Sequence, residues 1–454
     1  MVAYPVTVEA MSSRFDGEYT FVDLFAGCGG LSLGLMMAGW KGLAAVEKDS
    51  LAFETLRFNL IEGGRGWIYD WPDWLPKKPC NVRVFRRKYE EEIAALNGQV
   101  TLIAGGPPCQ SFSLAGRRNK GDPRNHLFKA YVEIVDLVRP RLLLLENVHG
   151  IAIEFNKKRR SQENTGGRRP RPYSARIKEA LEEIGYEVYP GLVRAVDYGV
   201  PQFRPRYIMV GVDTRRGYDL EGIAPFLMLS SQREAFLESK SIPVDRPVTV
   251  HDAISDLEAR GKGLVDCLDR PGFEQVAYAG PRTHYQRLLR DGCDGTAPNS
   301  MGMARHRPKT TERFERILST CRRGVQLCKA DRERFGLKKH CVVPLDGDRP
   351  CHTLTTLPDD ILHYAEPRIL TVREFARLQS FPDWFEFKGK YTTGGDRRVK
   401  ECPRYTQVGN AVPPLFAEFL GLVLHQLAEQ LVHGSLSETI RHRSADARCA
   451  RGAR

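Results

Sequence analysis

The sequence predicts an α/β fold in which helices cover both faces of a doubly wound, mostly parallel sheet, with a second, smaller domain attached. Apolar runs recur along the first third of the chain, and helix-like stretches separate them. Strands that are buried on both faces read as near-continuous apolar runs, and their alternation with helices indicates a parallel sheet. Glycines or polar residues follow each run, at the edge of the sheet where such folds bind ligands.

The first strand, expected at 20–25, leads into a turn that contains Gly27 and Gly29, and the second, at 42–46, ends at Glu47. Glycines let a backbone approach a ligand closely, and a carboxylate about 20 residues later commonly accepts hydrogen bonds from a ribose. The turn lacks the Gly-x-Gly-x-x-Gly pattern of dinucleotide sites, and the chain has no Gly-x-x-x-x-Gly-Lys-Ser/Thr loop. A nucleoside without a pyrophosphate, such as S-adenosylmethionine, therefore fits better than NAD or ATP.

The third apolar run, 100–104, stops at Gly-Gly-Pro-Pro and is followed by Cys109 and a loop rich in arginine and lysine. Proline ends the strand because it gives no N–H to a ladder. A thiol held beside a basic loop predicts a nucleophile aimed at an anionic substrate. A buried structural cysteine is an equally good interpretation of this segment alone. The fourth run, 141–145, leads directly into Glu146-Asn147-Val148.

Six segments of the chain closely resemble the motifs of the cytosine-C5 DNA methyltransferases, in the order typical of that family and over roughly residues 20–211 and 350–425. They are Asp23-Leu-Phe-Ala-Gly-Cys-Gly-Gly, Gly106-Pro-Pro-Cys-Gln-Ser-Phe-Ser, Glu146-Asn-Val, Gln202-Phe-Arg-Pro-Arg, Arg373-Glu-Phe-Ala-Arg-Leu-Gln-Ser-Phe-Pro and Gln407-Val-Gly-Asn-Ala-Val-Pro-Pro. The resemblance implies a class I methyltransferase fold and S-adenosylmethionine as methyl donor. It also implies methyl transfer to C5 of a flipped cytosine in a specific duplex sequence.

The same resemblance assigns the catalytic residues. Cys109 is expected to attack C6 of cytosine, and Glu146, in its protonated form, to hydrogen-bond N3 and the exocyclic amine. Arg206 and Arg204 are expected near the pyrimidine carbonyl, where guanidinium groups stabilise developing negative charge. Both arginines precede the strand expected at 207–212, so they reach the catalytic edge only if that strand runs antiparallel to the others. The run 186–196 and the following turn are compatible with such a hairpin.

For the cofactor, the resemblance implies adenine stacking on Phe25 and contacts with the ribose from Glu47. The full set of expected cofactor residues is Phe25, Ala26, Gly27, Gly29, Glu47, Pro108, Leu127 and Asn410. Leu127 is equally well interpreted as a helix core residue. The family usually has a short Asp-hydrophobic motif that contacts the adenine amine, and the chain has no clear counterpart before the third strand. Glu90, Glu91 and Glu92 are the alternatives there.

The charge of the chain suits DNA as its partner: the formal net charge is +12 and the isoelectric point is about 9.2. The segment 156–172 holds seven basic residues and one acidic residue, and it is either a phosphate-contacting element or a solvated loop. The loop 111–125 has the glycines and charges of a lid that closes on a flipped base. The expected DNA contacts are Gln110, Ser113, Arg117, Arg118, Lys120, Arg159 and Arg160.

The predicted domains are a catalytic and cofactor-binding domain at 1–212, a target recognition domain at 213–350, a returning C-terminal part at 351–432 and a basic disordered tail at 433–454. The recognition domain is assigned by its position in the resemblance. Its candidate DNA contacts are Arg305, His306, Arg307, Lys309 and Arg313, each of which is equally compatible with surface charge. Within 351–432, the apolar run 415–431 predicts a helix that returns to pack on the first domain.

The main prediction is therefore a DNA (cytosine-5-)-methyltransferase that acts on double-stranded DNA. A tRNA cytosine-C5 methyltransferase and a non-catalytic DNA-binding regulator are the alternatives. Eleven cysteines without a Cys-x-x-Cys pair predict reduced thiols in the cytoplasm, and their spacing matches no zinc module, so no metal is expected. We expect a monomer without a membrane span, since no run approaches about 20 apolar residues. A cognate restriction or defence-system protein and solitary action both remain compatible with the sequence.

Overall fold

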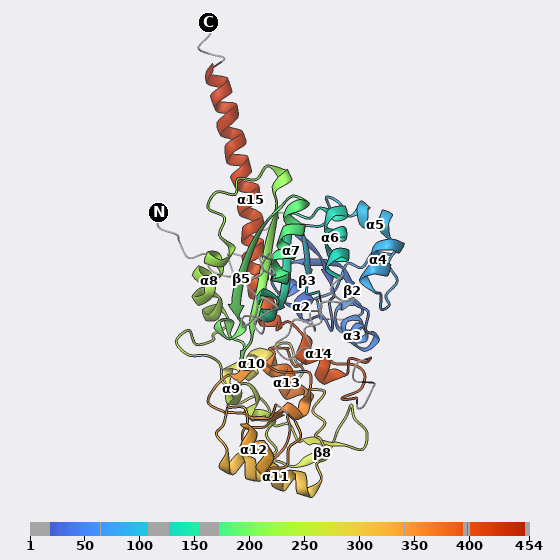
Figure 1. The fold of residues 1–454 in the computed structure, drawn as a ribbon, viewed down its shortest axis with the longest axis vertical. Coiled ribbons are helices and arrows are strands. Elements are labelled where there is room, and N and C mark those ends of the chain that lie inside the picture. Colours follow the sequence, from blue (N-terminus) through green and yellow to red (C-terminus); the bar gives the residue numbers. More distant parts are fainter. Residues whose placement is uncertain are drawn as a thin grey trace, which may run out of the picture.

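The computed structural model describes residues 19–63, 65–107, 127–153, 172–339, 341–393, 397 and 400–449. One part of the molecule contains the large sheet with helices on both faces, and a second part contains α9 to α13 and β8 (Figure 1). Residues 202–204 contact the helices α13 and α14, so this edge of the sheet faces the second part. The candidate site lies at this edge.

The large sheet has six strands in the order β2-β1-β3-β4-β7-β5. Their bounds are Thr20–Leu24 for β1, Lys41–Val46 for β2, Leu102–Gly105 for β3, Leu142–Val148 for β4, Tyr186–Arg194 for β5 and Pro205–Asp213 for β7. The strands β2, β1, β3 and β4 are parallel, and β7 pairs antiparallel with both β4 and β5. The predicted doubly wound, mostly parallel sheet is confirmed, as is its antiparallel hairpin.

Helices bury both faces of the sheet because side chains of each strand alternate between them. Phe21 faces a core that includes α2, α3 and α15, whereas its neighbour Val22 faces a core that includes α4 to α7. The helices are α2 Gly30–Met37, α3 Ser50–Leu56, η1 Arg57–Ile61, α4 Val82–Lys88, α5 Glu90–Ala95, α6 Leu127–Val138, η3 His149–Ala152 and α7 Tyr173–Glu183.

The rest of the chain forms short elements joined by long connections. Its helices are η5 Ala195–Tyr198, η6 Thr214–Arg216, α8 Pro225–Ser239, α9 Val250–Ile254, η7 Ser255–Leu257, α10 His284–Leu289, α11 Pro308–Thr320, α12 Lys329–Arg334, η8 Pro358–Asp360, α13 Val372–Leu378, α14 Arg404–Asn410 and α15 Pro414–Cys449. Its strand pairs are β6 Gln202–Phe203 with β11 Cys351–His352, β8 Leu264–Asp266 with β9 Glu274–Val276, and β10 Val343–Pro344 with β12 Ile361–Leu362. Although α8 lies within the range predicted for target recognition, it packs on α15 beside the sheet.

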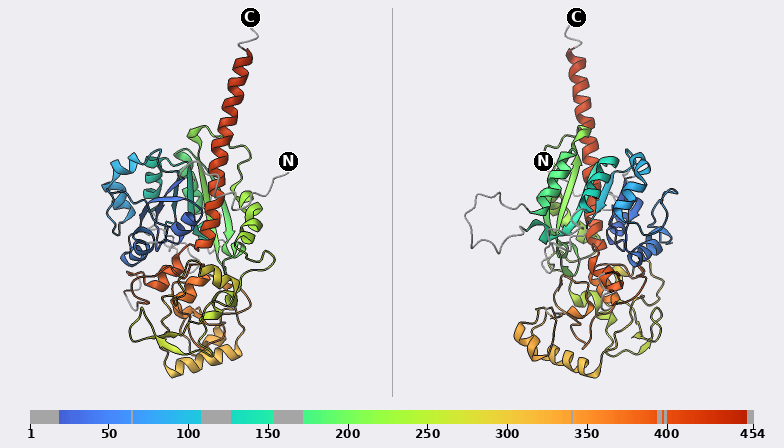
Figure 2. Two further views of the ribbon diagram at one scale, coloured as in Figure 1. Left: turned by 180° about the vertical axis from the view of Figure 1, so that it is seen from behind. Right: turned by 45° about the vertical axis from the view of Figure 1, so that its right-hand side comes forward.

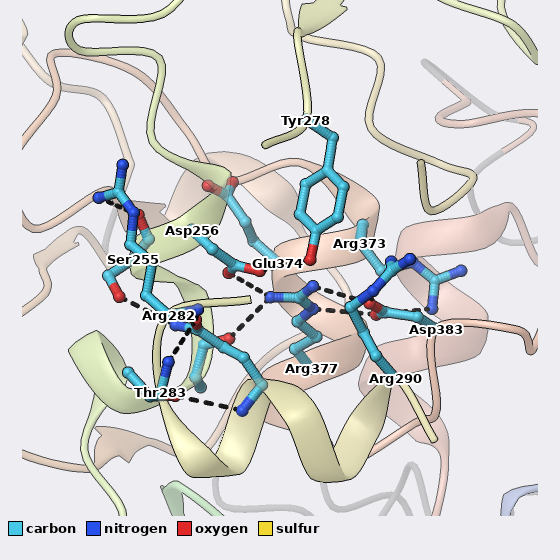
Figure 3. A network of polar contacts seen from close by, with 12 residues as sticks. Ser255, Asp256, Tyr278, Arg282, Thr283, Arg290, Arg373, Glu374, Arg377 and Asp383 are labelled. Carbon is cyan, nitrogen blue, oxygen red and sulfur yellow. Dashed lines mark hydrogen bonds and ion pairs between the residues drawn. The ribbon is translucent and has the colours of Figure 1, made fainter. Parts of the chain in front are cut away.

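A buried ionic network centred on Arg377 holds the second part together (Figure 3). The Arg377 guanidinium donates to both carboxylate oxygens of Asp383, at 2.9 and 2.7 Å, and also pairs with Asp256. Arg290 donates to Asp383 at 3.2 Å, and the hydroxyl of Tyr278 donates to Asp256 at 2.9 Å. These side chains come from α13, from η7, from the residue that ends α10 and from the connections between them, so the network joins these short helices in addition to the apolar core that they share.

The last helix, α15, packs along α2, as predicted for the apolar run 415–431. Seen from two further directions, it then projects from the sheet-bearing part on the side away from the second part (Figure 2). It continues as a helix to Cys449, whereas the sequence predicts a disordered tail from residue 433. The stretch Arg404–Val432 is long and apolar enough to cross a membrane, contrary to the expectation from the sequence, but most of it is buried inside the protein, as in a core helix.

Candidate functional site

Glu146 and Arg206 form an ion pair at the edge of the sheet that faces the second part. Glu146 lies near the end of β4, and Arg206 lies opposite Val148 in the antiparallel register of β4 and β7. The Nε atom of Arg206 is 2.6 Å from Oε1 of Glu146, and only 7% and 12% of the two side chains are exposed. Burial lowers the pKa of Arg206, and the adjacent Glu146 opposes this effect. The site thus holds a carboxyl group and a guanidinium group side by side and largely buried.

Asn147 and Gly106 fix the chain that leads from β3 toward Cys109. The side-chain amide of Asn147 donates to the carbonyl oxygen of Pro107 at 3.0 Å. A Cβ atom added to Gly106 would lie 3.3 Å from Oε2 of Glu146, so a larger residue would press on this carboxylate. The same strand end therefore positions both the carboxyl group and the turn that precedes the predicted nucleophile.

The glycine-rich turn after β1 brings its backbone to the start of α2. The N–H groups of Phe25 and Ala26 donate to the carbonyl oxygen of Val46 at 2.9 and 3.1 Å, and Phe25 adopts a left-handed φ of 69°. Gly27 and Gly29 also have positive φ, at 58° and 97°. A Cβ atom on Gly27 would meet no atom within 4 Å, so the turn borders open space. This geometry suits close approach by a ligand.

Glu47 lies beside this turn. Its carboxylate accepts hydrogen bonds from the backbone N–H of Gly27 at 3.0 Å and of Asp49 at 2.7 Å. Burial raises the pKa of Glu47. A carboxylate can accept about four hydrogen bonds, so Glu47 keeps acceptor capacity for a ligand such as a ribose. The position of Glu47 against the turn agrees with the spacing that predicts a ribose contact.

The segment at Asn81 and Val82, which is not among the residues that the sequence singles out, follows a residue hydrogen-bonded to Glu47. The N–H of Cys80 donates to the carbonyl oxygen of Glu47 at 2.7 Å, which brings this segment against the residue that follows β2. Asn81 caps α4 through a bond from the N–H of Arg83, and Val82 is buried. The signal was an asparagine directly before a helix pattern, which is typical of an N-cap. By contrast, Glu90, Glu91 and Glu92 lie in the next helix, α5.

The remaining described cofactor candidates lie at the ends of helices. Asn410 is exposed at the end of α14. Leu127 begins α6 and is buried in the core on that face of the sheet, which agrees with its interpretation as a core residue.

Arg204, a predicted catalytic residue, is buried against α14, where it donates to the backbone carbonyls of Gly409 and Ala411.

Several predicted contacts lie outside the described residues. These are Pro108, Cys109, Gln110, Ser113, Arg117, Arg118, Lys120, Arg159 and Arg160. Among the candidates of the second part, Arg305 lies over the ring of Phe273 and His306 accepts a hydrogen bond from the N–H of Ile369. The other three lie at or in the first turns of α11: Arg307, Lys309 and Arg313.

Comparisons with known proteins show which family the chain belongs to. The family model described as C-5 cytosine-specific DNA methylase matches residues 19–426. Type II methyltransferase M.DdeI of Desulfomicrobium norvegicum is 32% identical over 420 residues, which cover 88% of this chain and 86% of that protein. Type II methyltransferase M.XorII of Xanthomonas oryzae is 30% identical over 423 residues, 88% of this chain and 83% of that protein. A solved DNA modification methyltransferase encoded within an Escherichia coli prophage has a TM-score of 0.58 and 26% identity, over 91% of this chain and 100% of that one.

Proposed function

Since this chain belongs to the family of C-5 cytosine-specific DNA methylases and transfers a methyl group from S-adenosylmethionine to C5 of cytosine in DNA, we propose that Cys109, Glu146 and Arg206 perform the reaction on a flipped base. The observation that carries this proposal is the buried Glu146–Arg206 pair. It lies beside the backbone of Gly106 and Pro107, which leads directly to Cys109.

The residues around the glycine turn fit S-adenosylmethionine. Gly27 and Gly29 offer backbone to its methionine end, Glu47 has acceptor positions for the ribose hydroxyls, and Asn410 is exposed at the end of α14. We assign the adenine amine to the side-chain oxygen of Asn81, because the chain beside it is hydrogen-bonded to Glu47. When bound, the cofactor supplies an electrophilic methyl group on a sulfonium.

In the proposed reaction, the thiolate of Cys109 forms a bond to C6 of cytosine. Glu146, protonated in the complex with the base, donates to N3, which draws the ring's electrons away from C6 as the sulfur adds. Arg206 donates to the O2 carbonyl, where negative charge develops. The C5–C6 electron pair then forms the new bond from C5 to the methyl group. The C5 proton then passes to a water molecule, the electron pair of the C5–H bond re-forms the C5–C6 double bond, and the Cys109 sulfur leaves as a thiolate, which gives 5-methylcytosine.

Substituting Glu146→Gln tests this arrangement, because glutamine keeps the size and the hydrogen-bond donor but cannot exchange a proton with N3. Loss of one general-acid or electrostatic contact typically lowers turnover by about 10²- to 10³-fold. Incorporation of a labelled methyl group into DNA measures this effect, and Glu179→Gln on the exposed face of α7 serves as the matched control. Turnover of the Glu146→Gln enzyme within about threefold of wild type would remove Glu146 from the mechanism.

We also propose double-stranded DNA, rather than tRNA, as the substrate, and a specific sequence as the target. The curated relatives are named Type II methyltransferases, which supports a role beside a restriction enzyme in the cytoplasm, with this chain acting as a monomer. Bisulfite sequencing of DNA from cells that express the chain tests the substrate and reveals the target. Labelled methyl groups in purified tRNA but not in duplex DNA would contradict this assignment.

A further inference from the structure

Arg204 is a buried arginine whose environment differs from that of Arg206. Only 2% of the residue is exposed, and none of the carboxylates described in the structure forms an ion pair with it. Its Nη2 atom donates to the carbonyl oxygens of Gly409 at 3.0 Å and Ala411 at 2.9 Å, and its Nε has no hydrogen-bond partner. A buried charge without a counter-ion is costly unless fixed dipoles compensate it. The compensating groups here are these carbonyls and the side-chain oxygen of Gln202, which accepts from Nη1 of Arg204 at 3.3 Å.

These carbonyls lie at the C-terminal end of α14. The last carbonyls of a helix have no partner inside the helix and carry partial negative charge. Two glutamines complete the arrangement: Gln379 donates to the carbonyl oxygen of Val408 at 2.7 Å, and Gln202 donates to the side-chain oxygen of Gln379 at 2.8 Å. Arg204 and Gln379, from two separate motifs, therefore hold this one helix end, and Gln202 bonds to both of them.

Asn410 lies in the sequence between Gly409 and Ala411, whose carbonyl oxygens accept from Arg204, and Asn410 itself is exposed. The helix α14 also contacts the cofactor turn, because the thiol of Cys28 donates to the carbonyl oxygen of Gln407 at 3.7 Å. On the other side, a Cβ atom on Gly30 would lie 2.3 Å from the carbonyl oxygen of Val412. The end of α14 is thus packed against the start of the cofactor-binding helix α2.

Arg204 directly precedes β7, and Arg206 is the second residue of that strand, so the two arginines lie two positions apart. We propose that Arg204 is a positioning residue: it fixes the end of α14 so that Asn410 points to the cofactor, and it does not contact the pyrimidine. This inference rests on the proposed function and changes the role that the sequence predicts for Arg204. One short segment at the start of β7 then has two roles: Arg206 contacts the base, and Arg204 positions a residue that contacts the cofactor.

The test separates cofactor affinity from chemistry. In Arg204→Met, a side chain of similar length loses the donors without leaving a buried unpaired charge. Isothermal titration of the DNA-free protein with S-adenosylmethionine should show a Kd at least tenfold higher than in wild type. The KM for S-adenosylmethionine should rise with it, while kcat at saturating cofactor stays within a few-fold. The matched control is Arg206→Met, which should lower kcat strongly and leave the cofactor Kd within about twofold.

A second variant distinguishes a specific loss of cofactor affinity from general misfolding of Arg204→Met. Gln379→Met releases the carbonyl of Val408 without changing β7, and it should raise the cofactor Kd in the same direction. Arg204→Lys should restore part of the affinity lost in Arg204→Met. A wild-type Kd in both Arg204→Met and Gln379→Met would overturn the inference, as would a loss of kcat in Arg204→Met equal to that in Arg206→Met. Failure of the proposed function would look different, because the wild-type protein itself would then fail to methylate DNA.

Discussion

The buried carboxyl group of Asp23 makes a specific prediction about stability and pH. Asp23 lies in β1, directly before the cofactor turn, and only 1% of it is exposed. Its Oδ2 atom accepts a hydrogen bond from the hydroxyl of Ser32 at 2.5 Å, whereas Oδ1 has no partner. Burial raises the pKa of Asp23 from 3.8 to about 7, despite the opposing hydrogen bond from Ser32. The folded protein therefore holds a proton on Asp23 at a pH where the unfolded chain has lost it.

The sign follows from proton linkage. Because the pKa of Asp23 is higher in the folded protein than in the unfolded chain, its contribution to the free energy of unfolding is fully present below pH 3.8. This contribution is lost as the pH rises toward about 7. At about 1.4 kcal/mol for each pH unit, the loss for Asp23 amounts to about 4 kcal/mol at most. In Asp23→Asn, the amide keeps an oxygen for Ser32 but never ionises. The variant should therefore gain stability relative to wild type as the pH rises from 4 to 8.

Thermal unfolding midpoints of both proteins across this pH range provide the assay. The difference between Asp23→Asn and wild type should grow by several degrees in favour of the variant and level off above pH 7. Asp73→Asn, at an exposed position, serves as the control and should follow wild type throughout. A difference between Asp23→Asn and wild type that does not change with pH would refute the reasoning, because it would mean that Asp23 titrates alike in the folded and unfolded chains.

Three further predictions concern packing, the ionic network and the cofactor. In Gly34→Ala, the new Cβ would lie 2.4 Å from the carbonyl oxygen of Pro414, so α2 and α15 must separate; we expect a loss of about 1–3 kcal/mol in urea unfolding, and full stability would show that this contact is not tight. Asp256→Ala leaves the buried Arg377 with one carboxylate partner instead of two; it should cost about 3–5 kcal/mol, and a loss below 1 kcal/mol would contradict the importance of the network. Asn81→Ala should weaken S-adenosylmethionine binding several-fold in titration calorimetry without changing DNA affinity, and an unchanged cofactor Kd would exclude its contact with adenine.

Much of the fold could be predicted because local patterns determine it. The apolar runs at 20–25, 42–46, 100–104 and 141–145 correspond to β1 to β4, and the position of Arg206 before a strand required an antiparallel β7. The pairing of Glu146 with Arg206 follows from that topology.

Other features depend on contacts between distant segments, which no local pattern specifies. Arg204 and Arg206 have the same residue type and lie two positions apart, yet one holds a helix end while the other faces a carboxylate. Likewise, Asn81 lies near Glu47 because the N–H of its neighbour Cys80 donates to the carbonyl oxygen of Glu47. The helix that extends to Cys449 also differs from the disorder that its basic composition predicts.

The proposed reaction requires a covalent bond between Cys109 and C6 of cytosine. Duplex DNA in which 5-fluorocytosine replaces the target base tests it most directly, because fluorine cannot leave C5 as the proton does, and the enzyme remains attached after methyl transfer. With S-adenosylmethionine present, we predict a protein–DNA adduct that resists denaturation and maps by mass spectrometry to the peptide containing Cys109, and that Cys109→Ser does not form. Efficient methylation of DNA by Cys109→Ser, or an adduct at another residue, would contradict the account.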